Sequence, residues 1–125
     1  MVGTDIVEIK RVENFVEKWG NAALEKFLFP EEISLANNNI NSIAGFWAAK
    51  EAISKALGLG ISKECGFFDI KIYKLPSKAP SFTLSPHLIK KFEITSVSLS
   101  IAHDGGFAIA IAMIEGKKIL QNLEH

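Results

Sequence analysis

Residues 43–59 read IAGFWAAKEAISKALGL and contain the strongest helix signal in the chain. Apolar side chains recur at helical spacing over residues 43–57, and Gly58 is a suitable left-handed residue to end the helix. Alanines fill the side opposite the larger apolar residues, so the predicted helix is apolar almost all round. Such a helix is normally buried rather than laid on a surface. We therefore expect one long central helix with the rest of the chain packed against it.

Shorter elements surround this helix in the sequence. Before it we expect a strand at 2–9 and short helices at 11–19, 22–28 and 30–36. After it we expect strands at 67–75 and 81–84, a helix to residue 92 capped by Ser85, and strands at 97–103 and 107–114. The short loop Asp104-Gly105-Gly106 indicates a hairpin. The prediction is an α+β fold, with an antiparallel sheet packed on one long helix plus short helices.

The bulk composition is that of one globular domain, which we place at residues 1–122. Apolar residues make up 48% of the 125 and charged residues 22%, which argues against disorder. Fourteen basic and fourteen acidic residues balance, so nothing favours broad binding to nucleic acid or to membrane surfaces, although one small basic patch is compatible with the balance. No apolar run reaches the roughly 18 to 20 residues that span a bilayer.

Cys65 is the single cysteine, so no internal disulfide is expected. A reducing compartment follows most simply, and with no signal peptide before the first strand we expect a cytoplasmic protein. We expect Cys65 to be an inert thiol, because reactive thiols need an activating partner. Residues 123–125 resemble an expression-tag remnant, so His125 is given no ligand role.

Two acidic residues occupy positions where the pattern is otherwise apolar. In the predicted first strand, Asp5 shares a face with Gly3 and Val7, and in the long helix Glu51 is flanked by alanines that would let another backbone or a ligand approach closely. Two carboxylates from separate elements suit magnesium, which takes one or two protein oxygens and completes its shell with water and phosphate. The alternative for Glu51 is a helix pair with Lys55 at i, i+4, worth about 0.2 to 0.5 kcal/mol.

The predicted closing hairpin has a face of small side chains. With a simple register, it would carry Ser96, Ser98, Ser100 and Ala102 on the same side as Ala108, Ala110 and Ala112, and so permit close packing against the long helix. His103 stands at the end of the first of these strands, where a structural role and a ligand-binding role are both open. The stretch Gly58-Leu59-Gly60 also has two interpretations, a helix cap or a bare backbone that admits a phosphate.

Three segments together resemble a known family. They are Gly3-Thr4-Asp5-Ile6-Val7-Glu8-Ile9 with Arg11, Ala48-Ala49-Lys50-Glu51-Ala52 with Lys55-Ala56-Leu57-Gly58, and Val97-Ser98-Leu99-Ser100 with His103. In this order they are similar to the holo-acyl-carrier-protein synthases, the small trimeric type of phosphopantetheinyl transferase. The resemblance covers nearly all of residues 2–114.

The resemblance implies a magnesium-dependent transferase of fatty acid biosynthesis. A serine of apo acyl carrier protein would attack the β-phosphate of coenzyme A, take up 4′-phosphopantetheine and release 3′,5′-ADP. It implies that Asp5 and Glu51 hold magnesium, that Lys55 lies near the phosphates with a catalytic role, that Gly58 belongs to the phosphate loop, and that His103 lies near the nucleotide end. It further implies a homotrimer whose sites lie between neighbouring subunits.

Two departures from the family pattern concern the substrate contacts. Many relatives have an arginine where this chain has Phe46, followed by Trp47, so that one phosphate contact is missing or comes from elsewhere. A turn that often reads Gly-Lys-Pro is Lys78-Ala79-Pro80 here, which changes the loop on the nucleotide side. Residues 20–40 align poorly with the family, so no functional residue is carried over from them.

The helix at 11–19 is a candidate docking surface for the acidic carrier protein. Arg11, Phe15 and Lys18 lie at i, i+4 and i+7 and share a face, which would suit an acidic helical partner. The alternative places Phe15 in the core and leaves both cations as solvated surface. For the whole chain, the rival functions are a small α+β acyl thioester hydrolase and a non-enzymatic subunit, neither of which requires magnesium or Lys55.

Overall fold

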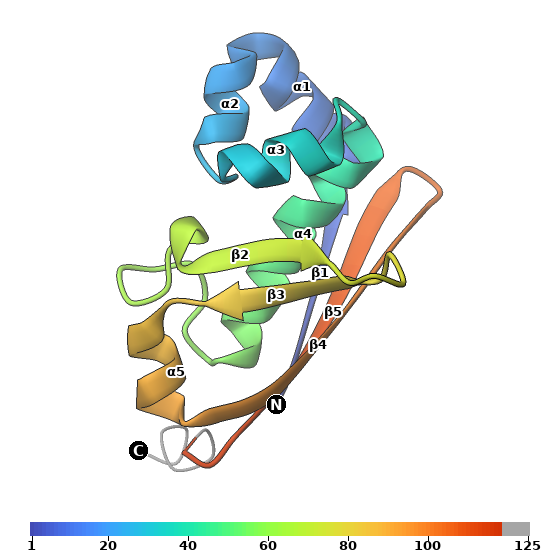
Figure 1. The fold of residues 1–125 in the computed structure, drawn as a ribbon. Coiled ribbons are helices and arrows are strands. Elements are labelled where there is room, and N and C mark those ends of the chain that lie inside the picture. The colour runs from blue at the N-terminus through green and yellow to red at the C-terminus, as the bar shows by residue number, and fades with distance from the viewer. Residues whose placement is uncertain (119–125) are drawn as a thin grey trace.

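The computed structural model describes residues 1–118 as helices and antiparallel strands in layers (Figure 1). In chain order the elements are β1 (Val2–Glu8), α1 (Ile9–Trp19), α2 (Asn21–Glu25), α3 (Pro30–Ala36), α4 (Ile40–Ala56), the 3₁₀ turn η1 (Phe67–Asp69), β2 (Ile70–Lys74), β3 (Pro80–Leu84), α5 (Pro86–Phe92), β4 (Ile94–Asp104) and β5 (Phe107–Gly116). The predicted α+β class is confirmed. The predicted tag remnant at 123–125 lies outside the described residues. Within residues 1–118, no helix combines the length and apolar character that crossing a bilayer requires.

The central helix α4 begins three residues earlier than the apolar pattern predicts. The side chain of Asn39 caps it, with Oδ1 accepting hydrogen bonds from the backbone N–H of Asn41 (2.9 Å) and Ser42 (3.2 Å). These bonds satisfy N–H groups that have no partner inside a helix, so the start lies at the cap rather than at the first buried side chain. The expected burial on nearly all sides is confirmed, since even Lys50 and Ser54 are fully buried.

The five strands form two antiparallel sheets, whereas the sequence suggested one. A three-stranded sheet has the order β1-β5-β4, and a two-stranded sheet pairs β2 with β3. Figure 1 shows α4 between them, with the short helices α1, α2 and α3 gathered at one end of the molecule. The inner face of the three-stranded sheet packs against α4 through fully buried alanines of β5: Ala108, Ala110 and Ala112.

The predicted register of the closing hairpin is wrong by one residue. Asp104 pairs with Phe107, so the loop is the two-residue pair Gly105-Gly106, both with positive φ (57° and 86°). Ser100 therefore faces the same side as Ile111, while the inward alanines pair with Leu99, Ile101 and His103. A shift of one residue reverses which face each side chain occupies, because side chains alternate along a strand.

The outer face of the three-stranded sheet is exposed and largely apolar. We call it the outer sheet face; its apolar members, 38% to 60% exposed, are Val2, Ile6, Phe107, Ile109, Ile111 and Met113. They lie together because the register pairs Val2 with Met113 and Ile6 with Ile109. Contiguous exposed apolar faces of this kind are typical of interaction surfaces.

The region 66–85 differs from the prediction in two local details. Residues 67–69 form η1, so β2 starts at Ile70, because Asp69 turns back and accepts a hydrogen bond from the backbone N–H of Gly66 (2.8 Å). Ser85 stands at the start of α5, but its hydroxyl donates to Asp69 Oδ1 (2.7 Å) and does not cap the helix. The same carboxylate thus fixes both ends of the β2–β3 hairpin region.

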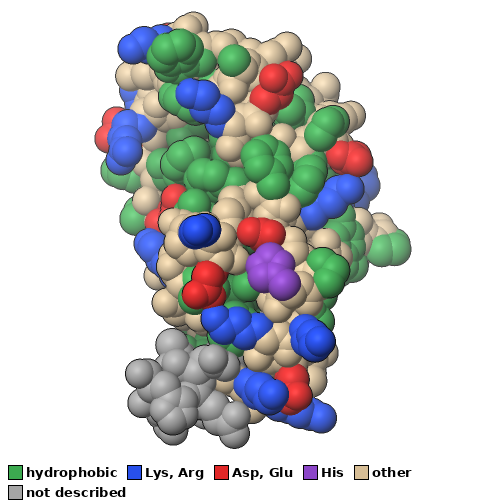
Figure 2. Space-filling view, turned by 90° about the vertical axis from the view of Figure 1, so that its left-hand side faces the viewer, with side chains coloured by type: hydrophobic (Ala, Val, Ile, Leu, Met, Phe, Trp, Pro, Cys, Tyr) green, Lys and Arg blue, Asp and Glu red, His purple; other side chains and the backbone are tan. Residues whose placement is uncertain are grey.

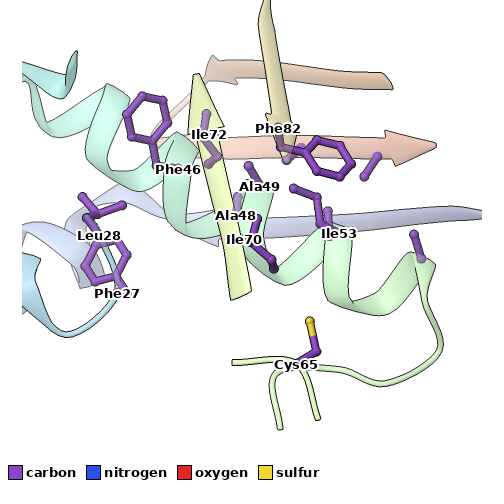
Figure 3. Close-up of a cluster of buried hydrophobic side chains, with 14 of the residues drawn as sticks. Phe27, Leu28, Phe46, Ala48, Ala49, Ile53, Cys65, Ile70, Ile72 and Phe82 are labelled. Carbon is purple, nitrogen blue, oxygen red and sulfur yellow. The ribbon is translucent and has the colours of Figure 1, made fainter. Parts of the chain in front are cut away.

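The hydrophobic core lies on α4 and under both sheets. Figure 3 shows Phe46 of α4 beside Ile72 of β2. Phe27 and Leu28 lie at the side of the cluster that faces the short helices. Cys65 is fully buried in the same cluster, and burial raises the pKa of its thiol to about 11, as expected of an inert thiol. On the face drawn in Figure 2, acidic and basic side chains alternate without a broad field of one sign.

Candidate active site

Gly3 brings β1 directly against α4. A Cβ built on Gly3 would collide with the carbonyl oxygen of Ala52 and lie 2.5 Å from the backbone nitrogen of Ala56. Both alanines are fully buried. The expectation that small residues on α4 admit another backbone is therefore confirmed, and the backbone is that of β1. Since Asp5 lies two residues along the same face of the strand, this approach places its carboxylate beside α4.

Lys55 bonds to Asp5 rather than to its own helix neighbour. Lys55 Nζ donates to Asp5 Oδ1 at 2.8 Å and to the carbonyl oxygen of Thr4 at 3.4 Å. The hydrogen bond to Asp5 is the main cause of the raised pKa of Lys55. Lys55 thus forms its hydrogen-bonded ion pair with Asp5, because β1 supplies a second carboxylate within reach, and it acts on Glu51, its i, i+4 neighbour, through its charge.

Glu51 is partly buried beside the same group. Its pKa is raised, first because burial disfavours the charged carboxylate and then because Asp5 carries a like charge nearby; Lys55 acts in the opposite direction. An acid with a raised pKa next to a second carboxylate indicates a functional site, since purely structural acids are usually neutralised by a partner. A cation placed between the two acids would remove their repulsion.

A cleft of about 480 Å³ contains both acids. Asp5 and Glu51 line it together with Arg11 and Phe15 of α1 and Trp47 of α4. The structure thus brings four of the predicted site residues to one hollow, and it adds Trp47. Phe15 is half-buried and borders the cleft, and its role in carrier docking stays a prediction.

The other four predicted residues do not line this cleft: Lys55, which bonds to Asp5, and Lys18, Gly58 and His103. Lys18 is exposed and stacks over Trp19, with Nζ 5.2 Å from the ring centroid. Gly58 follows the end of α4 with φ 75°, a left-handed conformation that favours glycine. His103 is exposed and lines a second hollow of about 730 Å³ with Asp104 and Lys10. A single ligand that touches both Lys55 and His103 would therefore need two copies of the chain or a long reach along one copy.

Phe46 stands where the family resemblance leads us to expect an arginine. It is 4% exposed and points into the core beside Ile72, as Figure 3 shows. This position therefore offers no polar contact to the cleft.

Sequence reasoning missed a buried ion pair next to the site. Lys50 and Glu32 are both fully buried, with Lys50 Nζ 2.8 Å from Glu32 Oε1. A lysine on a helix that is apolar almost all round was a usable signal, because a buried ammonium requires an acceptor. Its partner was not predictable, since Glu32 comes from a region without a strong pattern.

The acids fit magnesium better than a transition metal. Within residues 1–118, no group of three or more histidine, cysteine, aspartate or glutamate side chains gathers to hold a metal. Asp5 and Glu51 supply two hard oxygen donors, which is the protein share that magnesium takes when phosphate and water provide the remaining ligands.

Comparisons with known proteins agree on one family. Residues 1–112 match the model of the 4′-phosphopantetheinyl transferase superfamily. The holo-[acyl-carrier-protein] synthase of Wolinella succinogenes is 55% identical over 118 residues, covering 94% of this chain and 99% of that protein. That of Campylobacter lari is 52% identical over 115 residues, covering 92% and 98%.

Solved structures agree with the fold. The Helicobacter pylori holo-[acyl-carrier-protein] synthase in complex with coenzyme A is similar with a TM-score of 0.89 and 51% identity, over 92% of this chain and 100% of that one. The Neisseria meningitidis enzyme gives a TM-score of 0.82 at 34% identity, over 91% and 96%. The family resemblance predicted from the three sequence segments is confirmed.

Proposed function

This chain belongs to the 4′-phosphopantetheinyl transferase superfamily, and we propose that it transfers 4′-phosphopantetheine from coenzyme A to a serine of apo acyl carrier protein, releasing 3′,5′-ADP. The observation that supports this function in the site itself is the meeting of Asp5, Glu51 and Lys55 from two elements. The relatives named above carry the same activity in their names, and one of the similar solved structures contains coenzyme A.

Asp5 and Glu51 would hold magnesium, to which the pyrophosphate of coenzyme A adds its oxygens. When bound, the metal supplies a Lewis acid and a template for phosphoryl transfer. Lys55 would give up part of its ion pair with Asp5 and contact the phosphates. Its half-exposed side chain permits this movement. The half-buried position of Glu51 keeps its carboxylate from being fully hydrated, so a cation in the cleft is a favourable neighbour.

Coenzyme A would extend from this cleft along the end of α4. The backbone N–H groups of Leu59 and Gly60 both bond to the carbonyl oxygen of Ser54, so the chain after Gly58 curls tightly over the end of the helix. We place the phosphate loop here. His103 would contact the nucleotide end, and because it lines a different hollow, we place each complete site between two copies of the chain.

The outer sheet face supports the proposed homotrimer. Its apolar side chains come from β1 and β5 and continue to the serines of β4, while the acidic residues of the face, Glu8, Asp104 and Glu115, lie towards its ends. Covering it with copies of the same chain removes the exposed apolar area from water. We propose that this contact also brings His103 of one copy towards Lys55 of another.

Carrier docking is proposed for α1. Arg11 lines the cleft at the start of the helix, and the exposed Lys18 lies two turns further along. Between them Phe15 offers an apolar contact. An acidic helix laid on this surface would bring its serine to the cleft without the protein needing net positive charge. We place the reaction in the cytoplasm, in keeping with the single buried cysteine.

The decisive experiment incubates the protein with apo acyl carrier protein, coenzyme A and magnesium, and weighs the carrier by mass spectrometry. We expect the carrier to gain one phosphopantetheine arm and 3′,5′-ADP to appear in equal amount. Leaving out magnesium should prevent both. Hydrolysis of an acyl thioester without carrier modification would favour the hydrolase instead, and no reaction of either kind would favour a non-enzymatic subunit.

A further inference from the structure

The Glu32–Lys50 pair satisfies every polar atom of its two side chains. Lys50 Nζ donates to Glu32 Oε1 (2.8 Å) and to the carbonyl oxygens of Phe27 (2.8 Å) and Phe67 (2.9 Å). Glu32 in turn accepts from the backbone N–H of Phe29 at Oε1 (2.7 Å) and of Ile72 at Oε2 (2.8 Å). One pair therefore ties α3, the chain around α2, η1 and β2 to the middle of α4.

Stability alone does not account for this arrangement. Both side chains are fully buried, and burying charges is costly even when they are paired. Replacing such a buried pair with apolar side chains of similar volume is often neutral or stabilising. What the charged pair adds is defined positions for the backbone, because each of its hydrogen bonds holds one backbone segment in place.

The segments that Lys50 holds are the ones that contact Trp47. The indole of Trp47 meets the ring of Phe27 edge to face, with centroids 4.9 Å apart, and the ring of Phe67 at 5.1 Å. These are the two residues whose carbonyl oxygens accept from Lys50. Trp47 in turn lines the cleft with Asp5 and Glu51. The contacts thus run from the buried pair to the wall of the cleft.

We propose that Glu32 and Lys50 are positioning residues, which set the indole of Trp47 as the wall of the cleft beside Glu51. Lys50 also adjoins Glu51 in the chain, so the same bonds limit rotation of α4 where the acid projects. The kinetic part of this proposal rests on the proposed function; the placement of Trp47 does not.

A single-tryptophan protein tests the placement directly. The chain has two tryptophans, and Trp19 is exposed on α1, so Trp19→Phe leaves Trp47 as the only indole. In this parent we would compare Glu32→Gln/Lys50→Met, in which methionine fills the volume of the lysine stem. Glutamine keeps one oxygen, which can accept from one of the two backbone N–H groups that Glu32 binds. The matched control is Glu31→Gln/Lys71→Met, an exposed pair (3.2 Å) that joins the same α3 and β2.

We expect the Glu32/Lys50 double variant to unfold cooperatively but to have a red-shifted Trp47 emission and a weaker near-UV dichroism than the parent. Its kcat for carrier modification should fall by about 10- to 100-fold, the usual effect of losing a supporting contact. KM for coenzyme A should stay near the parent value, because Lys55 takes no part in the pair. The control pair should change neither signal.

An unchanged Trp47 spectrum in the folded double variant would overturn the proposal, whatever the rate. If the parent itself does not modify the carrier, the proposed function fails while the spectra still decide the placement. If the double variant does not fold, Glu32→Gln alone, which keeps the shape of the side chain, is measured in its place. A red shift of Trp47 emission in Glu32→Gln would support the proposal, and an unchanged emission would reject the proposal.

Discussion

At the scale of single residues, Asp5 and Glu51 are the proposed magnesium ligands of the cleft. They come from a strand and a helix, and both side chains are partly shielded from water. Asp5→Asn and Glu51→Gln keep size and shape while removing the charge that a magnesium ion needs. Each should lower kcat/KM for carrier modification by at least about 100-fold, because metal-based stabilisation of phosphoryl transfer is worth several kcal/mol. Mass spectrometry of the carrier at limiting magnesium measures this.

The control for these variants is Glu25→Gln, an exposed acid on α2 outside the cleft. It should match wild type. Near-normal turnover of Asp5→Asn or Glu51→Gln at limiting magnesium would show that the residue concerned is not a ligand.

Glu51 should also lower the stability of the metal-free protein near neutral pH, compared with a variant that has a neutral side chain at this position. Its folded-state pKa is raised by burial and by Asp5, so the folded protein binds a proton more tightly than the unfolded chain. The protonated Glu51 carboxyl therefore contributes to the free energy of unfolding. This contribution is fully present below the ordinary glutamate pKa and is lost as pH rises through the raised folded-state pKa. In metal-free buffer, Glu51→Gln should therefore have a higher Tm than wild type at pH 7.

The advantage of Glu51→Gln should shrink on acidification towards and below the ordinary glutamate pKa, where the wild-type carboxyl is itself neutral. Thermal unfolding followed by circular dichroism at several pH values measures the difference. An equal or lower Tm of the variant at pH 7 would show that the ionised carboxylate of Glu51 does not destabilise the folded protein. Lost activity with higher stability is a common outcome at functional sites.

At the scale of elements, the contact of β1 with α4 depends on Gly3. Alanine at this position has no room against Ala52 and Ala56 of the buried helix. The strand must move outward, and we expect a loss of about 1 to 3 kcal/mol of unfolding free energy, as overpacked cores show. Asp5 moves with the strand, so activity at saturating magnesium should fall as well. Chemical denaturation and the carrier assay measure the two effects.

A suitable control for Gly3→Ala is Gly20→Ala, where the built Cβ meets nothing although φ is 58°. It strains the turn between α1 and α2 locally and leaves the β1–α4 contact alone. We expect both variants to lose stability. Only Gly3→Ala should lose activity. Full activity of Gly3→Ala would mean that Asp5 tolerates displacement and does not need this close approach.

Helix α1 is the element through which we expect the carrier to bind. Arg11→Glu should lower kcat/KM for the carrier by at least about tenfold, mainly through slower association, because steering depends on local charge. The wild-type rate should fall with added salt, and the variant should lose most of that dependence. Coenzyme A affinity should change little. Stopped-flow or steady-state assays at several salt concentrations measure this.

Lys90→Glu on α5 makes the same charge change at another exposed site. It should leave carrier use nearly unchanged. If Arg11→Glu instead weakens coenzyme A binding, or works normally with the carrier at low salt, α1 is not the docking surface.

At the scale of the whole molecule, the outer sheet face is the proposed contact between copies of the chain. Ile111 lies in the middle of this face, between Thr4 of β1 and Ser100 of β4. Ile111→Glu should convert the proposed trimer to monomers, because a charge cannot be buried there without a partner. Activity should be lost in parallel, since His103 and Lys55 would no longer meet across copies. Light scattering and the carrier assay are run on the same samples.

Ile89→Glu introduces the same charge at an exposed isoleucine of α5, outside the outer sheet face. It should keep the trimer and the activity. An active monomer, either of the wild type or of Ile111→Glu, would reject both the trimer and the shared site.

The sequence by itself determined the features that depend on local pattern. The central helix, the order of most elements and the unusual positions of Asp5 and Glu51 all follow from periodicity, because an acid in an apolar phase is visible without coordinates. The segments around these residues were also sufficient to identify the family. What periodicity could not supply were exact ends, such as the start of α4, since a cap or a hydrogen bond sets them.

Only the tertiary structure decided which distant groups meet. The loop at Gly105-Gly106 is one residue shorter than the simple register assumed, and that difference turned the serines outward. Lys55 bonds to Asp5 because Gly3 brings β1 close, and Lys50 finds Glu32 across the core. These pairings depend on how segments far apart in the chain pack, and the free energy of burying a charge selects its partner from whatever the fold places within reach.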